Sequence, residues 1–343
     1  RREALLVVQG EVGDFVEEAA AGDVVADVGV VVHVGDVHIA AAPGALGGLG
    51  LAVDLEAVLL RGVLHQGRVG LMAQDETGRQ LERHERFRGE YPIEVEGLTN
   101  RFGDQVIHQD LDLKVRRGEI LGVVGGSGTG KSVLMRSIIG LQHPAEGDIR
   151  VFGRSVVGTD PEQDIGIRNR WGVLFQSGAL FSSLTVAQNI EVPLFEHTNL
   201  PLDVIEEICA LKIGLVGLPR EAASKYPMEL SGGMRKRAGL ARALALDPEI
   251  VFLDEPTAGL DPIGAAAFDE LLRSLQGSLG LTVFMVTHDL DSLHAVCDRI
   301  AVLGDKHVIV TGSMAEMLEQ EHPWIRDYFH GPRGRAARRP ENA

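Results

Sequence analysis

Four short apolar runs recur along the chain after residue 90, and each is followed at once by glycine or polar residues. They cover residues 119–124, 171–175, 250–253 and 281–286. Runs of this length and composition are typical of strands buried on both faces of a parallel sheet. We therefore expect the residues that follow them to meet at one edge of that sheet, where α/β folds place ligands.

Alternating and helical patterns surround these runs. Residues 92–98 and 106–115 predict two strands around a turn at 100–105, residues 147–153 a further strand and turn, and residues 299–311 a hairpin across Gly304 and Asp305. Helical spacing occurs at residues 132–139, 184–192, 204–215 and 262–279, and a capping box from Ser313 to Glu316 predicts one more helix start. The mostly helical stretch from 177 to about 227 indicates a helical subdomain inserted into an α/β core.

A glycine-rich loop joins the first buried run to the first helix. It fits the G-x-x-x-x-G-K-[ST] pattern of a phosphate-binding loop, with residues Gly125, Gly126, Ser127, Gly128, Thr129, Gly130, Lys131 and Ser132. Glycines let backbone N–H groups curl around a phosphate, Lys131 brings positive charge to the β and γ phosphates, and the Ser132 hydroxyl suits Mg²⁺. A chance match has a probability on the order of one in a hundred, so nucleotide binding is the first hypothesis.

Polar side chains follow the other three buried runs. Asp254 and Glu255 come directly after residue 253, Gln176 after 175, and His288 shortly after 286. Adjacent acids after a buried strand are costly to place for packing alone; beside a phosphate loop, Asp254 suits ordering of Mg²⁺ and Glu255 suits activation of the attacking water. Taken alone, Gln176 is typical of a polar strand cap and His288 of a surface or core histidine, but both fall at the same sheet edge as the loop.

A second anion-binding helix start is predicted at residues 230–234. Ser231 suits an N-cap, and Gly232 and Gly233 leave backbone N–H groups bare at the start of a helix that continues to Leu246. An ordinary capped helix explains these residues as well if they are taken alone. Phe102, a little over twenty residues before the loop, also has two interpretations, an aromatic face for a base or a core or turn residue.

Composition excludes some classes of protein. The 343-residue chain carries a net charge of −16, which argues against a protein that coats nucleic acid. Cys209 and Cys297 lie far apart and outside any metal-ligand spacing, which indicates reduced core thiols and suits the cytoplasm. We expect neither a membrane span, which needs about 20 apolar residues, nor a signal peptide, so work at a membrane requires a partner.

Both ends of the chain differ from the middle. Residues 1–90 contain no Ser, Lys, Asn, Cys, Trp or Tyr, although turns and helix caps normally use Ser and Asn. Two interpretations are open: a small β-rich accessory domain around residues 24–40, or an extension outside the working module, which we favour. Residues 331–343 combine Arg with Pro and Gly and predict a disordered basic tail that anionic lipid could attract.

Together these motifs resemble those of ABC-type ATPases in order and spacing, over residues 91–330. The resemblance implies an α/β P-loop NTPase fold, with a RecA-like core, an antiparallel β subdomain and a helical subdomain at about residues 177–240. It also implies that Phe102 stacks on adenine, that Gln176 senses Mg²⁺ and touches a membrane subunit, and that Ser132 and Asp254 hold the same ion. Glu255 would be the catalytic base, and His288 the switch that contacts the γ-phosphate.

The same resemblance implies a site shared between two copies of the chain. Ser231, Gly232 and Gly233 would contact the γ-phosphate of ATP bound by the opposite subunit, and Asp261 would cross the interface. ATP would then lie between Lys131 of one copy and Ser231 of the other. The homodimer would close on ATP and open after hydrolysis, which moves whatever is docked near Gln176.

Two segments and one residue are most similar to the ATPase subunits of Mla-type phospholipid transporters: residues 175–201, residues 322–332, and Met234, where many relatives have Gln. This implies a peripheral subunit on the cytoplasmic face of the inner membrane, working with an integral-membrane permease, an MCE-type lipid-binding protein and, in some systems, a small regulatory subunit. Such transporters move phospholipid across the Gram-negative envelope and maintain outer-membrane lipid asymmetry. Phe102 replaces the more common Tyr without removing a catalytic group.

Three alternative functions are compatible with the same phosphate-binding loop. The chain could serve another ABC importer, act as a soluble ABC ATPase of DNA repair or translation, or be a small-molecule kinase. Soluble ABC ATPases usually carry two cassettes or long coiled-coil insertions, and the acidic charge also counts against nucleic acid. A kinase has no reason for the motif at residues 230–233.

Overall fold

The chain divides into two units, Arg1–Leu81 and Glu82–Ala343. The structure, a computed structural model, describes residues 31–34, 37–40, 87–159 and 165–331. In the first unit, β1 (Val31–Val34) and β2 (Val37–Ala40) form an antiparallel hairpin. This hairpin falls within residues 24–40, where the sequence favours β structure. The rest of that stretch and the basic tail from 332 onward lie outside the described residues, so both interpretations of the first unit stay predictions.

A six-stranded sheet forms the centre of the second unit, in the order β12-β11-β5-β10-β9-β8. All neighbours are parallel except β11 and β12. The strands are β5 (Ile120–Gly125), β8 (Trp171–Leu174), β9 (Ile250–Asp254), β10 (Thr282–Val286), β11 (Arg299–Gly304) and β12 (His307–Gly312). The four apolar runs are therefore the adjacent strands β5, β10, β9 and β8, and the residues that follow them meet at one edge, as expected.

The apolar composition of these strands follows from burial on both faces. In β9, Ile250 and Phe252 belong to the core beneath a second sheet, whereas Val251 and Leu253 belong to the core beneath the helices. All four side chains are fully buried. An alternating polar position would have exposed a hydrogen-bonding group to one of these cores, at a substantial cost.

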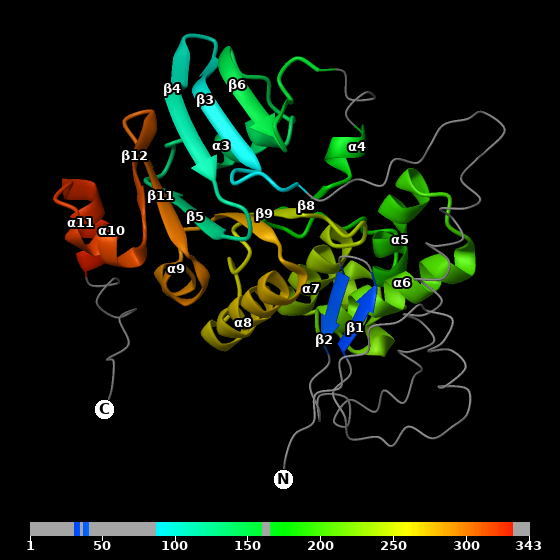
Figure 1. The fold of residues 1–343 in the computed structure, drawn as a ribbon. Coiled ribbons are helices and arrows are strands. Elements are labelled where there is room, and N and C mark those ends of the chain that lie inside the picture. Colours follow the sequence, from blue (N-terminus) through cyan, green and yellow to red (C-terminus); the bar gives the residue numbers. More distant parts are fainter. Residues whose placement is uncertain (1–30, 35–36, 41–86, 160–164, 332–343) are drawn as a thin grey trace. The chain divides into compact units, whose positions relative to one another are not determined.

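The second sheet is antiparallel, in the order β4-β3-β6-β7. Its strands are β3 (Ile93–Phe102), β4 (Gln105–Val115), β6 (Glu146–Val151) and β7 (Arg154–Ser155). Helix α3 (Lys131–Ile138) lies between the two sheets (Figure 1) and buries Leu134, Met135 and Ile138 in their shared core. The helix that follows the phosphate loop is thereby fixed on both sides.

The turn predicted at residues 100–105 is shorter in the structure, so the prediction of its length was wrong. Strand β3 continues to Phe102, and only residues 103–104 form the turn. Asn100, which suggested a turn, is fully buried and pairs across the strands with His108. Its amide is satisfied by side chains, as described below, so tertiary contacts override its local preference for turns.

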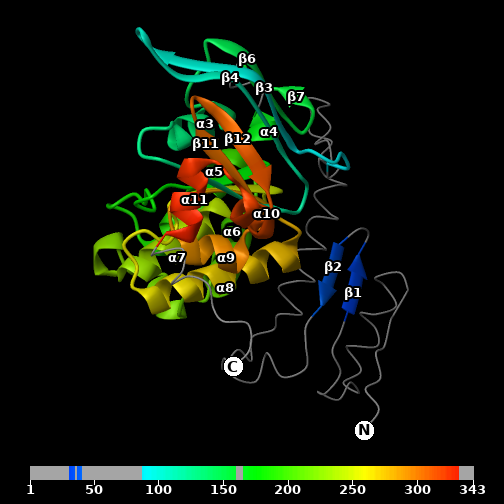
Figure 2. The ribbon, with the colours of Figure 1, turned by 90° about the vertical axis from the view of Figure 1, so that its left-hand side faces the viewer.

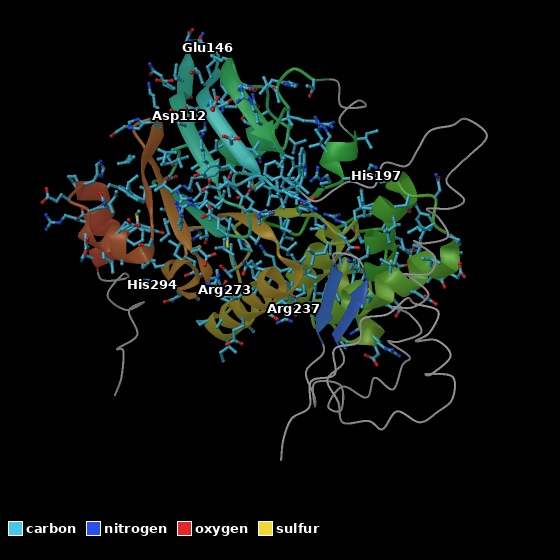
Figure 3. The ribbon with its side chains drawn as sticks, viewed as in Figure 1. Asp112, Glu146, His197, Arg237, Arg273 and His294 are labelled. Carbon is cyan, nitrogen blue, oxygen red and sulfur yellow. The ribbon has the colours of Figure 1, made fainter. Side chains whose placement is uncertain are left out.

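Helices α7 (Gly232–Ala243) and α8 (Pro262–Leu279) lie on the opposite face of the large sheet, and α5 (Val186–His197) and α6 (Leu202–Leu215) pack beside α7 (Figure 1). Two short 3₁₀ turns, Arg220–Ala222 and Pro227–Glu229, join α6 to α7. Arg237 of α7, labelled in Figure 3, donates a hydrogen bond to the Val216 carbonyl, just after α6, at 2.9 Å. The helical stretch starts later than predicted, at Val186, because Thr185 and Gln188 form a capping box there.

The remaining helices are short. They are α4 (Ile165–Arg168), α9 (Leu290–Val296), α10 (Met314–Glu319) and α11 (Pro323–His330). Ser313 caps α10 with the predicted capping box, whereas the others are too short for periodicity to detect. Helices α10 and α11 lie beside β11 and β12 (Figure 2) and share a core with them. Among the described helices, none has the length and hydropathy that a membrane span requires.

Candidate functional site

The phosphate loop connects β5 to α3. Strand β5 ends at Gly125 and the helix begins at Lys131. Gly128 and Gly130 have φ angles of 79° and 93°, a left-handed conformation that favours glycine. A Cβ atom on Gly125 would collide with the carbonyl oxygen of Leu303 in β11. Backbone geometry therefore requires glycine at these positions, whatever the loop binds.

The ammonium group of Lys131 lies against the loop. Its Nζ donates to the carbonyl oxygens of Gly125 at 2.9 Å and Gly126 at 3.0 Å. Burial lowers the pKa of Lys131, and the carboxylates of Glu255 and Asp254 oppose that shift. Because both acceptors are neutral, the positive charge of Lys131 is available to an anion bound by the loop.

Asp254 and Glu255 follow β9 at the same edge. The Asp254 side chain is nearly buried, at 7% exposure, and its Oδ1 accepts a hydrogen bond from Ser132 Oγ at 3.4 Å. Burial and the neighbouring charge of Glu255 raise the pKa of Asp254, while the Ser132 hydroxyl acts against them. A hydroxyl and a carboxylate at this distance form the kind of oxygen pair that suits Mg²⁺.

Glu255 is held by its backbone and faces a histidine. Its φ angle is 49°, which is uncommon for a residue other than glycine, and its N–H donates to the Val286 carbonyl at 2.8 Å. Its Oε2 lies 2.8 Å from Nδ1 of His288. The Glu255 side chain is 14% exposed and that of His288 67%. The pair thus presents a sheltered carboxylate together with an imidazole that solvent or a ligand can reach.

Gln176 is placed through its backbone. Lys236 of α7 donates its Nζ to the carbonyl oxygen of Gln176 and to that of Glu255, the latter at 2.8 Å. Burial lowers the pKa of Lys236, against the charges of Glu255 and Asp254. The Gln176 side chain itself is exposed. Sequence reasoning missed Lys236, whose only signal was its position on the buried face of an otherwise ordinary helix.

The glycine motif before α7 forms a capped helix start. Ser231 Oγ accepts a hydrogen bond from the N–H of Met234 at 3.2 Å. Cβ atoms at Gly232 and Gly233 would meet only the Leu260 side chain, at 3.7 and 4.0 Å, which is ordinary contact. Packing within this chain therefore does not require the two glycines, in contrast to those of the phosphate loop.

Asp261 and Phe102 complete the predicted set. Asp261 caps α8 by accepting from the Gly264 N–H at 2.9 Å and is exposed. Phe102 ends β3 with 48% of its surface exposed. The structure brings the phosphate loop, Asp254, Glu255 and His288 together. Within the described parts of this one chain, no hydrogen bond or ring contact joins Ser231, Asp261 or Phe102 to them.

A buried polar cluster behind the loop escaped the sequence analysis. Asn100 Nδ2 lies 3.0 Å from His108 Nδ1 and donates to Ser137 Oγ at 3.1 Å. All three residues are buried. Burial lowers the pKa of His108, opposed by the backbone of Thr129 and Gly130. The cluster connects β3 and β4 to the helix of the phosphate loop, and a buried histidine within an alternating strand was its only sequence signal.

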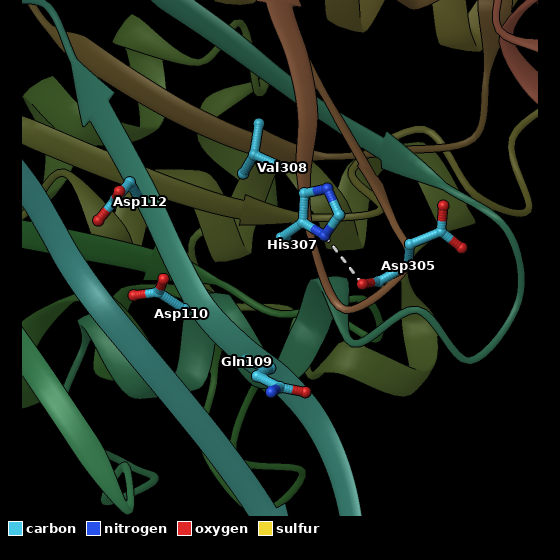
Figure 4. Close-up of a pocket in the computed structure, with 6 residues that line it drawn as sticks. All are labelled: Gln109, Asp110, Asp112, Asp305, His307 and Val308. Carbon is cyan, nitrogen blue, oxygen red and sulfur yellow. Dashed lines mark hydrogen bonds between the residues drawn. The ribbon is translucent and has the colours of Figure 1, made fainter.

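An acidic pocket lies elsewhere, between β4 and the β11–β12 turn. Figure 4 shows its lining, with His307 Nδ1 2.9 Å from the Asp305 carbonyl oxygen. The lining residues are Gln109, Asp110, Asp112, Asp305, His307 and Val308. None belongs to the predicted site, and no group of three or more His, Cys, Asp or Glu side chains in the described part of the chain is arranged to hold a metal ion.

Comparison with known proteins places these motifs in context. Residues 108–258 match a family model described as ABC transporter. The chain is 41% identical over 241 residues to the probable ribonucleotide transport ATP-binding protein mkl of Mycobacterium tuberculosis (strain ATCC 25618 / H37Rv), covering 70% of this chain and 67% of that protein. It is 38% identical over 239 residues to the intermembrane phospholipid transport system ATP-binding protein MlaF of Haemophilus influenzae (strain ATCC 51907 / DSM 11121 / KW20 / Rd), covering 70% and 90%.

A solved structure is similar across nearly all of its own length. The dimeric structure of a post-hydrolysis state of the ATP-binding cassette MJ0796 bound to ADP and Pi superposes with a TM-score of 0.60 and 28% identity. The match covers 65% of this chain and 98% of that chain.

Proposed function

This chain belongs to the ABC transporter family of ATP-binding proteins, and from that premise we propose that it hydrolyses ATP to drive phospholipid transport across a Gram-negative envelope. ATP binding and the P-loop NTPase fold follow from membership, as the sequence predicted. The observation that carries the proposal of hydrolysis is the contact between Glu255 and His288 at the sheet edge that bears the phosphate loop.

In the proposed reaction, the loop binds and orients the triphosphate. Backbone N–H groups of residues 126–131 and the N-terminus of α3 face the phosphates, and Lys131 exchanges its carbonyl acceptors for phosphate oxygens. Glu255 accepts a proton from the attacking water, because it is the sheltered carboxylate next to the bound γ-phosphate. His288 contacts the γ-phosphate with the part of its ring that is exposed, while its Nδ1 stays close to Glu255.

Ser132 and Asp254 would hold Mg²⁺, with Gln176 joining when its exposed side chain turns inward. The pairing of Ser132 Oγ with a nearly buried Asp254 carboxylate supports this assignment. When bound, the ion neutralises negative charge on the phosphate oxygens. Burial and the charge of Glu255 raise the pKa of Asp254, so its carboxylate is disfavoured as an uncompensated anion.

A second copy of the chain is proposed to complete the site. Ser231, Gly232 and Gly233 form a helix start whose glycines are not needed for internal packing, and Asp261 is exposed at the start of α8. Both features fit surfaces that meet a ligand or a second subunit. A related cassette has been solved as a dimer with ADP and Pi, which supports a homodimer that closes on ATP.

The proposed transport substrate is phospholipid. The name of the Haemophilus influenzae relative supports this choice, as does the coverage of 90% of that protein. The chain would work at the cytoplasmic face of the inner membrane, in a complex with an integral-membrane permease and an MCE-type lipid-binding protein, and a small regulatory subunit is a further candidate component. The name of the mycobacterial relative favours ribonucleotide as the second candidate.

Purification of the chain with its membrane partners, followed by mass spectrometry of bound small molecules, tests this choice. We expect phospholipid in the complex and none with the chain purified alone. Enrichment of ribonucleotides other than ATP and ADP, without phospholipid above the detergent background, would favour the second candidate and reject the first.

A further inference from the structure

Helix α11 is anchored on one face and contacts the nucleotide site with the other. Ile325 and Phe329 are fully buried in a core that also contains Val124 of β5 and Leu293 of α9. The side chains of Trp324 and Tyr328, one helical turn apart, stack with ring centroids 4.8 Å apart and an interplanar angle of 13°. The helix is thus held by its buried residues and carries a pair of stacked aromatic rings.

These two rings reach two loops of the site. Tyr328 Oη donates a hydrogen bond to the carbonyl oxygen of His288 at 3.0 Å. The indole Nε1 of Trp324 lies 3.6 Å from the position that a Cβ atom on Gly126 would occupy. Burial raises the pKa of Tyr328, and the charges of Glu255 and Asp289 act in the same direction. The phenol therefore stays protonated near neutral pH and remains a donor.

The backbone of His288 needs such a support because its side chain receives little packing. The imidazole is 67% exposed, and its one polar contact described in the structure is with Glu255. Before it, the Thr287 N–H donates to the Val123 carbonyl at 3.3 Å, and after it, the Asp289 N–H donates to Thr287 Oγ1 at 3.1 Å. The hydrogen bond from Tyr328 is the contact that ties the carbonyl of His288 itself to another element.

We propose that Tyr328 is a positioning residue for ATP hydrolysis, which acts by fixing the backbone at His288 while Trp324 bounds the phosphate loop at Gly126. Helix α11 then contributes to hydrolysis through the backbone of His288. The inference rests on the proposed role of His288. It gives a function to α11, which falls within the segment that the sequence singled out only by resemblance.

Tyr328→Phe tests the proposal because it removes one hydroxyl and keeps the stacked ring. In the full chain, we expect kcat for ATP hydrolysis to fall about three- to tenfold, the scale of one neutral hydrogen bond, with KM for ATP unchanged within about twofold. Tyr91→Phe makes the same chemical change at the start of the small sheet, outside the site, and should leave both constants unchanged. An unchanged kcat in Tyr328→Phe would overturn the proposal.

Two further measurements separate positioning from general destabilisation. In single-turnover assays, Tyr328→Phe should add no further loss in a His288→Ala background, because the group it positions is gone. Hydrogen exchange should accelerate at residues 287–290 while the amides of α11 keep their protection. Multiplicative losses, or exchange that accelerates throughout α11, would assign Tyr328 a structural role only. Normal hydrolysis by His288→Ala alone would instead reject the proposed role of His288.

Discussion

At the scale of single residues, burial shifts the pKa values of three charged groups near the phosphate loop. The two cations Lys131 and Lys236 have lowered pKa values and the carboxylate Asp254 a raised one, and desolvation is the largest cause in each case. Each charged form is costly here without a counter-charge. A metal-bound polyphosphate would supply counter-charges of both signs. Its binding would therefore offset the desolvation cost that these side chains carry in the free protein.

Glu255→Gln should keep ATP binding and lose at least about 10²-fold in hydrolysis, the usual scale of a lost general base. The amide preserves the shape of the side chain but cannot accept the proton. ATPase rates and nucleotide affinity, measured on the same preparation, check this expectation. Glu270→Gln, an exposed position on α8, is the matched control and should behave as the parent. Hydrolysis by Glu255→Gln at the parental rate would remove Glu255 from its role.

A buried carboxyl on α8 predicts a pH-dependent stability. Asp269 accepts from Ser292 at 2.8 Å, and burial raises its pKa from 3.8 to about 6. The folded state therefore binds this proton more tightly than the unfolded chain. Its stabilising contribution is complete below pH 3.8 and is lost as the pH rises through 6.

Asp269→Asn stays uncharged at every pH and isolates that contribution. Between about pH 4 and pH 7, the free energy of unfolding of the parent relative to this variant should fall by up to about 3 kcal/mol. Denaturant unfolding at several pH values measures it. A difference that is constant over this range would show that Asp269 titrates alike in the folded and unfolded chains.

At the scale of elements, side chains from two helices converge on the loops that follow β8, β9 and β10. Lys236 joins α7 to the loops after β8 and β9 through the carbonyls of Gln176 and Glu255, and Tyr328 joins α11 to the loop after β10. The loops after β8 and β9 are thus both attached to α7, whereas the loop after β10 is attached to α11. Movement of α7 relative to the sheet would therefore displace the backbone at Gln176 and Glu255.

Gly130→Ala should damage the phosphate loop more than its backbone angle alone predicts. A left-handed alanine costs about 1–2 kcal/mol, and here the added Cβ would also collide with the buried ring of His108. Gly153→Ala is the control, since Gly153 has a φ of 78° but open space around it. We expect Gly130→Ala to be the less stable by more than about 1 kcal/mol and to lose ATP affinity, which Gly153→Ala should keep. Equal stability and affinity would refute the tight packing of His108 on the loop.

Elements with strong local patterns were predictable and elements defined by distant contacts were not. Strands β5, β8, β9 and β10 were predictable from their apolar runs. Helix α8 spans the predicted residues 262–279. Helix α11 has only eight residues and depends on packing against β5 and α9. Asn100 has a local preference for turns but lies in a strand. Its side chain donates to Ser137, which is 37 positions away and cannot be identified from local sequence.

The same division applies to the site. The phosphate loop, Asp254, Glu255 and His288 could be predicted because each follows a buried strand, and a parallel sheet gathers such positions at one edge. Lys236, His108 and Tyr328 could not, because a buried lysine, a strand histidine and a helical tyrosine have no spacing of their own. Their roles emerge only from the atoms they contact.

At the scale of the whole molecule, the residues assigned to the proposed nucleotide site lie on two separate surfaces of the chain. Lys131 and the carboxylates form one surface, and the helix start at Ser231 forms another, with no contact described between them in this chain. In a two-fold dimer, each surface can meet the opposite one of its partner. ATP would then join the two copies, and hydrolysis would release them.

Mixing two inactive variants tests this account most directly. Lys131→Ala removes the phosphate-binding charge, and Ser231→Asp keeps an N-cap on α7 but repels phosphate. We expect each variant to be inactive alone and an equal mixture to recover up to about a quarter of the parental ATPase rate, since half of random dimers are mixed and each has one intact shared site. A mixture no more active than its two components would contradict a site built from both subunits.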